Sequence, residues 1–348
     1  MKRLISLVAV LACMAVGYAQ SALVATLNHG EAVSVFYGAS ALAEAYDAAT
    51  HGDVITLSNG TFNSVDIAKN ITVRGAGMDE TGPCTRISGD VYLYGVPDSV
   101  DATGHLTLEG LYHDGEIYYT TKDSTYTSPI KNAHFVKCRL NKINYYYHKN
   151  DVLQNAVFLQ CRIKGGLYLQ TLGSYAHCIN SVIYGPVVSS SSKDTQFEFT
   201  NCLVIGNPGS WDHSLFTNCI LENTYSSTSS LPSSCMVSNC LGIGYGSSTH
   251  NIFNKLYPAN KYGTIKGTDV AIIFKTFTGT YSDTETFELT DEAKAQYLGT
   301  DGTEVGIYGG SLPFTTESSL PKIKKFNVAS KSTEDGKLKV EIEVSGVE

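Results

Sequence analysis

The sequence predicts an all-β protein whose chain winds as a coiled β-solenoid, with coils of roughly 20 residues. The first observation is a returning phrase, because F-T-N-C-L-V-I-G begins at Phe199 and F-T-N-C-I-L-E-N begins at Phe216. A small residue recurs at the same place in each related phrase, at intervals of 17 to 23 residues: Cys138, Cys161, Ser181, Cys202, Cys219 and Cys240. This interval is too short for repeats of paired helices. The second observation is the composition, since 32 Gly, 22 Tyr and 17% charged residues are typical of a turn-rich sheet protein.

Each repeat contains the features of one coil. Phe199, Cys202 and Val204 are apolar, as expected for side chains that enter a narrow core from a strand. Because the spacing from Phe199 to Cys202 is odd, strict alternation fails and the backbone must bend between them. Asn201, like Asn218 in the next repeat, tolerates the left-handed conformation of such a corner. We expect the stacked coils to set Asn on Asn about 4.8 Å apart, with amides bonded along the axis.

The first 19 residues are typical of a secretory signal peptide. Lys2 and Arg3 precede an apolar run that ends at Gly17-Tyr18-Ala19, with small residues at both positions that a signal peptidase reads. The run is short for a membrane anchor, and no other stretch of the sequence has the length and apolar character of a transmembrane segment. We therefore expect a secreted or cell-surface protein without a membrane span.

Residues 20–37 read as an extended lead-in, and one short helix follows. The helix is expected to begin after Ser40 and to end before Gly52. Its apolar face consists of Leu42, Ala45, Tyr46 and Ala49. Such a helix would cover the open apolar end of the first coil and hide its unpaired edge.

Two stretches of the sequence resemble a known family. A-A-T-H-G-D-V-I-T-L-S-N-G-T-F, followed by I-T-V-R-G-A-G and T-R-I-S-G-D, resembles the opening of secreted right-handed parallel β-helix proteins of the pectin-lyase-like group. F-E-L-T-D-E-A-K-A-Q-Y-L-G-T-D-G-T-E-V-G-I-Y-G-G resembles the final coil of a subset common in Bacteroidetes, where G-I-Y-G-G closes the helix. The resemblance implies a right-handed single-stranded parallel β-helix over residues 38–314. It implies little about activity, because this fold carries lyases, hydrolases, adhesins and other surface proteins.

A linker and a C-terminal β-hairpin are expected over residues 315–348. Leu338, Val340, Ile342 and Val344 alternate with charged residues, and Asp335-Gly336 marks the turn. So short a hairpin is not stable alone. It either docks on the solenoid or its C-terminal mouth, or offers a strand to another molecule by edge pairing.

Eight cysteines follow the expected leader, an even number that in a secreted chain suggests disulfides. Five of the eight stand at the repeat position, which favours a buried ladder of reduced thiols. Cys84, Cys178 and Cys235 fall outside that position. The cysteine spacing does not suggest a zinc site.

The charge makes nucleic acid an unexpected partner. The formal net charge is −8, and no cluster of Lys and Arg is present. Phosphate binding depends on concentrated positive charge.

Catalysis has weak support in the sequence. Pectate lyases resembling this fold use acidic residues to hold calcium and an Arg or Lys as the base, and Arg139 and Arg162 both follow a repeat Cys. Arg162-Ile163-Lys164 reproduces the R-I-K string of polygalacturonases, but the other motifs of those enzymes are missing before it. Arg139, Arg162 and Lys164 are the catalytic candidates. No metal or other cofactor is expected, with calcium needed only if the protein is a lyase.

Aromatic residues give the stronger indication of a ligand. Adjacent tyrosines occur where strand alternation must expose some of them, and Trp211 lies in a loop flanked by Gly and Pro. The candidate ligand-binding residues are Tyr118, Tyr119, Tyr145, Tyr146, Tyr147 and Trp211. Their rings could stack on sugars, although stacked tyrosines are also ordinary surface pairs of a sheet.

The sequence thus favours a non-catalytic secreted or cell-surface protein that binds or contacts a polysaccharide or surface glycan. One alternative is a polysaccharide lyase or glycoside hydrolase. Another is a structural or adhesive element that assembles through the C-terminal hairpin.

Overall fold

The computed structural model of the chain describes residues 23–120, 128–145, 151–169, 171–189, 196–248, 250–253, 257–279, 281–328, 331 and 335–345. The expected signal peptide lies outside the described residues, as do Tyr146 and Tyr147.

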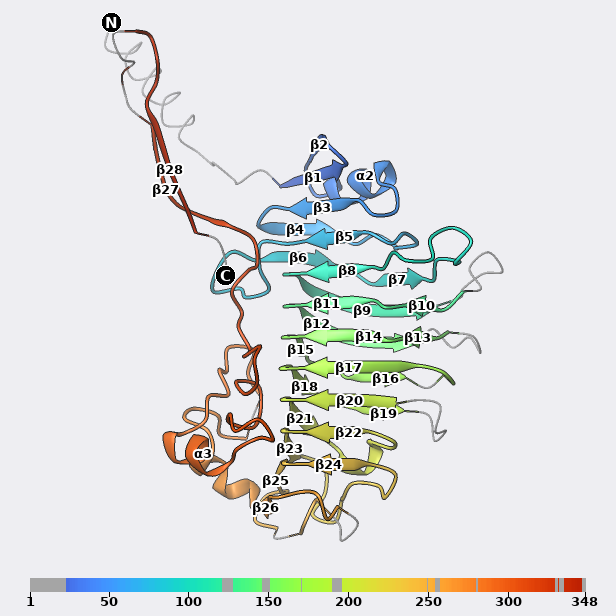
Figure 1. Cartoon of the computed structure of the whole chain (residues 1–348), viewed down its shortest axis with the longest axis vertical. Coiled ribbons are helices and arrows are strands. Elements are labelled where there is room, and N and C mark those ends of the chain that lie inside the picture. The colour runs from blue at the N-terminus through green and yellow to red at the C-terminus, as the bar shows by residue number, and fades with distance from the viewer. Residues whose placement is uncertain are drawn as a thin grey trace, which may run out of the picture.

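Most described strands belong to two large sheets (Figure 1). Sheet A has eleven strands in the order β2 (Ala32–Tyr37), β1 (Val24–His29), β3 (Val54–Leu57), β5 (Thr72–Arg74), β8 (Thr107–Glu109), β11 (His134–Val136), β14 (Ala156–Leu159), β17 (Tyr175–Ile179), β20 (Gln196–Thr200), β22 (Leu215–Thr217) and β24 (Met236–Ser238). The main path of sheet B runs through β26 (Thr264–Ile265), β25 (Leu241–Ile243), β23 (Ile220–Asn223), β21 (Leu203–Gly206), β18 (Val182–Tyr184), β15 (Arg162–Ile163), β12 (Arg139–Tyr145), β9 (Tyr112–Thr120), β6 (Thr85–Ser88) and β4 (Gly60–Asn63). β7 (Val91–Tyr94), β16 (Leu167–Leu169) and β19 (Val187–Ser189) join sheet B beside that path, and β10 (Ile130–Lys131) pairs with β13 (Leu153–Gln154).

The chain passes alternately through the two sheets. β20 in sheet A is followed by β21 in sheet B, then by β22 in sheet A and β23 in sheet B. The pairs β20–β22 and β21–β23 are parallel, so equivalent residues of successive repeats lie side by side, such as Phe199 and Phe216. The protein is therefore mostly β-structure in two large, chiefly parallel sheets with few helices, in agreement with the predicted class.

The repeat residues line a common core between the sheets. Phe199, Cys202 and Val204 are fully buried, as predicted. The Phe199 and Phe216 rings stack with centroids 5.0 Å apart. One column of apolar side chains thus continues from layer to layer, which lets short repeats share a core that none could bury alone.

A left-handed residue makes the corner between the sheets. The six residues that precede the repeat Cys or Ser have φ between 45° and 56°: Lys137, Gln160, Asn180, Asn201, Asn218 and Asn239. The next residue then donates to the carbonyl two positions before it, as in Cys202 Sγ to Thr200 O at 3.3 Å and Ser181 Oγ to Ile179 O at 2.8 Å. This position therefore suits a small buried side chain that can donate a hydrogen bond. Both the Cys thiol and the Ser hydroxyl meet this requirement, which explains why Ser replaces Cys in one repeat. All eight cysteines of the described residues are free.

The helix predicted after residue 40 is α2 (Ala41–Ala48). All four residues of its predicted apolar face are buried, and it packs against β1, β2, β3 and β4. Ser40 occupies the N-cap position but makes no capping bond with its side chain. The expected extended lead-in forms the antiparallel pair β1–β2, and β1 also pairs antiparallel with β3. The helix and this pair cover the first layer of the core.

A covering segment, residues 267–279 and 281–314, lies along the outer face of sheet B. It contains the 3-10 helix η2 (Gly267–Ile272) and the helix α3 (Asp291–Gln296). Its apolar side chains form a second core with the outward side chains of the sheet B strands β18, β21, β23 and β25. The expectation that Gly306-Ile307-Tyr308-Gly309-Gly310 closes the end of the solenoid is wrong, because this stretch runs along the side of the stack.

The corner amides hold the covering segment. Asn180 Nδ2 donates to Ile307 O at 2.8 Å and to Gly309 O at 2.7 Å. Gln160, Asn218 and Asn239 make equivalent bonds to residues 312–313, 300 and 298. The predicted bonds between successive amides at this corner are therefore replaced by bonds to a second chain segment. The contact of Asn155 Nδ2 with Asn132 Oδ1, at 3.4 Å, lies at a different corner.

The C-terminal hairpin consists of β27 (Lys322–Val328) and β28 (Val340–Ser345), which pair antiparallel. Figure 1 shows it projecting from the stack. The four apolar side chains predicted for one face, at 338, 340, 342 and 344, are 48–54% exposed. Docking of this face on the rest of the chain is thus contradicted.

The corner amides lead to a stability prediction. Asn180→Ala removes two buried hydrogen bonds. It also puts Ala in the left-handed region, which Asn tolerates better because its side chain is polar. We therefore expect the unfolding free energy to fall by about 3–4 kcal/mol. Asn180→Gly should cost less, because only the bonds are lost. Asn155→Ala is the control, since Asn155 has φ of 54° and an exposed side chain. Equal losses for the alanine variants in urea unfolding would contradict this role.

One carboxyl group is buried beneath the covering segment. Glu222 is 5% exposed among the outward side chains of sheet B, where Ile205 and Ile243 flank it in register. Burial raises the pKa of Glu222 to about 8. In the unfolded chain the same carboxyl group has the ordinary glutamate pKa of 4.5.

This difference predicts that stability falls as the pH rises from about 4.5 to about 8, because only the unfolded chain releases the Glu222 proton in that window. Glu222→Gln should be nearly neutral at low pH and should raise the unfolding free energy by about 3–5 kcal/mol above the window. Thermal unfolding across this pH range measures both effects. If the unfolding free energies of the wild type and of Glu222→Gln differ by the same amount at every pH, the burial of Glu222 as a neutral acid is contradicted.

Candidate functional site

The strand register of sheet B places the candidate arginines in one outward column. Arg86 pairs with Tyr112, Tyr112 with Arg139, and Arg139 with Arg162 in successive layers. The next residue in the column is Val182, which pairs with Arg162. The outer face is therefore cationic and aromatic in these layers and apolar in the layers that follow, where the covering segment packs.

Arg139 is held by two carboxylates that come from distant parts of the chain. Its Nη1 lies 3.2 Å from Glu80 Oε2 and its Nη2 lies 2.6 Å from Asp283 Oδ2. The Tyr112 ring lies between Arg139 and Arg86, with guanidinium-to-centroid distances of 4.1 and 4.5 Å. Arg86 also forms an ion pair with Glu80, so one carboxylate joins both arginines.

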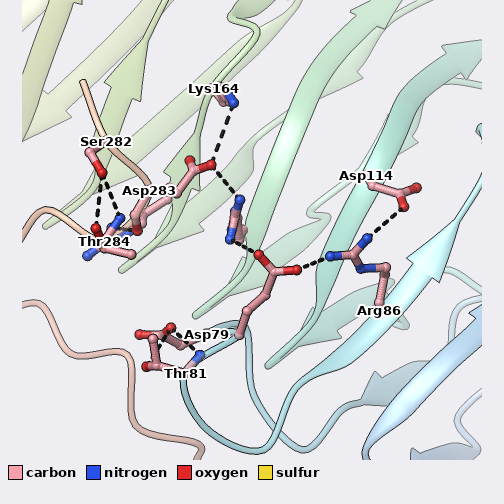
Figure 2. Close-up of polar contacts among 11 residues, drawn as sticks. Asp79, Thr81, Arg86, Asp114, Lys164, Ser282, Asp283 and Thr284 are labelled. Atoms are coloured by element: carbon pink, nitrogen blue, oxygen red, sulfur yellow. Dashed lines mark hydrogen bonds and ion pairs between the residues drawn. The ribbon is translucent and has the colours of Figure 1, made fainter. Parts of the chain in front are cut away.

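Figure 2 shows the ion pairs as a continuous chain from Asp114 and Arg86 to Asp283 and Lys164. Arg86 Nη1 lies 3.7 Å from Asp114 Oδ2, and Lys164 Nζ lies 3.5 Å from Asp283 Oδ2. We call Glu80, Arg86, Arg139, Arg162, Lys164 and Asp283 the arginine cluster.

Arg162 anchors the covering segment. Its Nη1 donates to Asp283 O at 2.5 Å, and its Nη2 donates to Glu285 O at 2.9 Å. The guanidinium lies 5.3 Å from the centroid of the Phe314 ring, and the residue is 6% exposed. Arg162 thus points outward from sheet B, but the covering segment removes it from solvent.

The cluster has the composition of a catalytic site and the geometry of a structural one. A lyase would use an Arg base near carboxylates, and a hydrolase would use two carboxyl groups that face one groove. The structure brings Arg139 to Glu80 and Asp283. These carboxylates are already paired with cations, and the Arg139 side chain is 11% exposed. Glu80 and Asp283 stand 59 and 144 residues from Arg139, and no local pattern marks either one.

The structural role of the cluster can be tested by unfolding. Arg162→Ala leaves two carbonyls of the covering segment without their donor, so we expect a loss of about 2–4 kcal/mol. Lys164→Ala is the control, because Lys164 is 54% exposed and an exposed pair contributes less than about 1 kcal/mol. Equal effects of the two changes on urea unfolding would argue against Arg162 as an anchor.

A second outward column of sheet B is aromatic. Tyr92 pairs with Tyr118, and Tyr118 pairs with Asn144. Ile143 pairs with Leu167, which places Tyr168 in the layer after Asn144. We call Tyr92, Tyr118, Asn144 and Tyr168 the tyrosine column.

Charged residues accompany the tyrosine column. The Tyr92 and Tyr118 rings stack with centroids 5.2 Å apart and an interplanar angle of 17°. Lys142 Nζ lies 4.7 Å from the Tyr168 centroid and 3.3 Å from Glu116 Oε2. Burial, followed by the hydrogen bond to Glu116, raises the pKa of Tyr118, so its hydroxyl remains protonated. Because stacking and Lys142 cover ring faces, the column presents mainly ring edges and polar groups.

The structure corrects several predicted ligand-binding residues. Tyr119 is fully buried and its hydroxyl donates to Tyr168 O at 2.5 Å, because it occupies the inward position of its strand. Trp211 is also fully buried, with its ring 5.7 Å from that of Phe216. Tyr145 is half-buried and packs against the core.

Tyr118 is the predicted ligand-binding residue that lies in the column. Tyr92 and Tyr168 were missed, although V-Y-L-Y and L-Y-L alternate in the manner of strands with an outward Tyr. Tyr146 and Tyr147 have no described position.

Within the described ranges, no group of three or more His, Cys, Asp or Glu side chains is arranged to hold a metal ion. None of the described helices has the length and apolar character needed to cross a bilayer.

Comparison of the chain with protein-family models, with curated proteins and with solved structures found no match. Inference about function therefore depends on the geometry of the two columns.

Proposed function

We propose that this chain is a secreted or cell-surface protein, non-catalytic, that binds or contacts carbohydrate along the outer face of sheet B. We further propose that its fold is a right-handed single-stranded parallel β-helix. The alternation of the chain between two parallel sheets at intervals near 20 residues supports this fold, and crossovers between parallel strands are nearly always right-handed. The leader-like residues 1–19 support export.

The observation that carries the binding proposal is the tyrosine column. Tyr92, Tyr118 and Tyr168 repeat along the stack, whose layers are about 4.8 Å apart. Glu116, Lys142 and the tyrosine hydroxyls add donors and acceptors along the same line. A rigid row of aromatic edges and polar groups suits a linear chain rich in hydroxyls, because each sugar can bond to an equivalent place on the next layer.

The charge around the column favours neutral glycans over polyuronates. Asp90 and Glu116 stand in the neighbouring outward positions, with Glu116 N donating to Asp90 Oδ1 at 2.8 Å. Lys142 is already paired with Glu116, and the whole chain has a formal charge of −8. Carboxylates of a uronate chain would meet like charge here.

We expect a neutral polysaccharide to retard the protein in affinity electrophoresis, with polygalacturonate giving weaker retardation. Tyr168→Phe removes one hydroxyl from the column and should weaken binding roughly fivefold, the equivalent of about 1 kcal/mol for one hydrogen bond. Tyr225→Phe is the matched control, because Tyr225 is 67% exposed and lies outside the column. If neither Tyr168→Phe nor Tyr225→Phe changes the retardation, the tyrosine column is not the binding surface.

The arginine cluster supports a second candidate, a polysaccharide lyase or glycoside hydrolase. Its specific observation is the contact of Arg139 with Glu80 and Asp283. Incubation with glycans, with and without calcium, followed by assays for new reducing ends and unsaturated uronates, tests it. Product that is lost in an Arg139→Lys variant with unchanged stability would favour the enzyme over the binding protein.

A further inference from the structure

One end of sheet A is an open strand edge. β2 is the terminal strand of the sheet and, among the described strands, pairs only with β1. Val33, Val35 and Tyr37 project from one of its faces and are 62%, 45% and 67% exposed. An edge strand with a row of exposed apolar side chains is a template for pairing with a further strand.

The C-terminal hairpin likewise pairs with no third strand among the described residues. Its strands pair with each other, and neither makes an extensive contact with another helix or strand of the described chain. Phe326 stands opposite Ile342 and Val328 opposite Val340, so apolar positions of both strands lie on one face. A two-stranded ribbon of this kind is marginal in water and is stabilised by a third strand.

The β2 edge and the C-terminal hairpin match each other in strand length and in charge. β2 and β28 each have six residues and β27 has seven. Residues 23–68, which include β2 and α2, contain no Lys or Arg and five acids: Glu31, Glu44, Asp47, Asp53 and Asp66. β27 contains Lys322, Lys324 and Lys325 and no acid. β2 itself carries no charged residue, and Lys325 pairs with Glu341 of β28. Pairing of β27 with β2 would thus bring Lys322 and Lys324 toward the acids around β2, so that unlike charges meet.

We propose that the free edge of β2 in one molecule receives the C-terminal hairpin of a second copy, with β27 as the pairing strand. Among the described residues no further strand covers either surface, and we take the partner of each to be the matching surface of another molecule. The two surfaces differ, and the contact is heterologous: each molecule in an assembly offers one hairpin and accepts another. This interaction is independent of the proposed glycan binding.

Two charge variants of the full chain test the pairing by light scattering coupled to size exclusion. Val35→Lys alters β2 and Ile342→Lys alters the hairpin; both positions are exposed, so the fold should tolerate each change. Val100→Lys, at a position that is 61% exposed outside both surfaces, is the control. We expect the wild type and the control to show a mass above 37.5 kDa that rises with protein concentration and falls with added salt. Each single variant should be a monomer.

Mixing the two variants distinguishes this contact from others. The Val35→Lys chain keeps its hairpin and the Ile342→Lys chain keeps its β2, so the mixture should form a dimer that grows no further. A symmetric hairpin-to-hairpin contact would not be restored by mixing. A monomeric wild type at all concentrations, including one whose hairpin folds back on its own β2, would overturn the proposal, as would assembly that neither variant changes.

Discussion

The left-handed corner residue is the constraint on which the rest of this structure depends. It turns the chain from one sheet to the other, and in four of the six repeats its side-chain amide bonds to the covering segment. Asn180 satisfies both requirements, with φ of 45° and two bonds to carbonyls of the covering segment. Asn is suited to this position because it tolerates the left-handed region and carries a donor. At the Asn corners, the same residue thus turns the chain and holds a segment that can lie more than 100 residues away, as Asn180 does.

The covering segment divides the outer face of sheet B into two parts. It buries the apolar layers from β18 to β25, and Arg162 and Asp283 hold it where those layers meet the polar ones. Arg162, one of the catalytic candidates in the sequence, thus holds this boundary. The tyrosine column lies in other strands of the same sheet, in β7, β9, β12 and β16, and it supplies the repeated outward groups on which the proposed glycan contact depends.

Local patterns predicted the repeats well and long-range contacts poorly. The strand around Phe199, the left-handed Asn201 and the apolar face of α2 follow from residue type and spacing, which the chain itself carries. The burial of Leu203 and Ile205 beside Val204 was missed, although a continuous apolar run indicates a strand covered on both faces. The partners of Arg139 depend on which distant loops lie against the sheet, and residue spacing in the sequence does not predict that arrangement.

Hydrogen exchange of the backbone amides in residues 298–314 tests the central role of the corner amides most directly. Thr300 N donates to Asn218 Oδ1 at 2.9 Å and Gly306 N to Asn218 O at 2.8 Å. If the amides bind this segment, these N–H groups should be protected to a degree similar to those of the neighbouring strands, and Asn218→Gly should release Thr300 selectively. Rapid exchange across the whole segment in the wild type would contradict the binding of this segment to the corner.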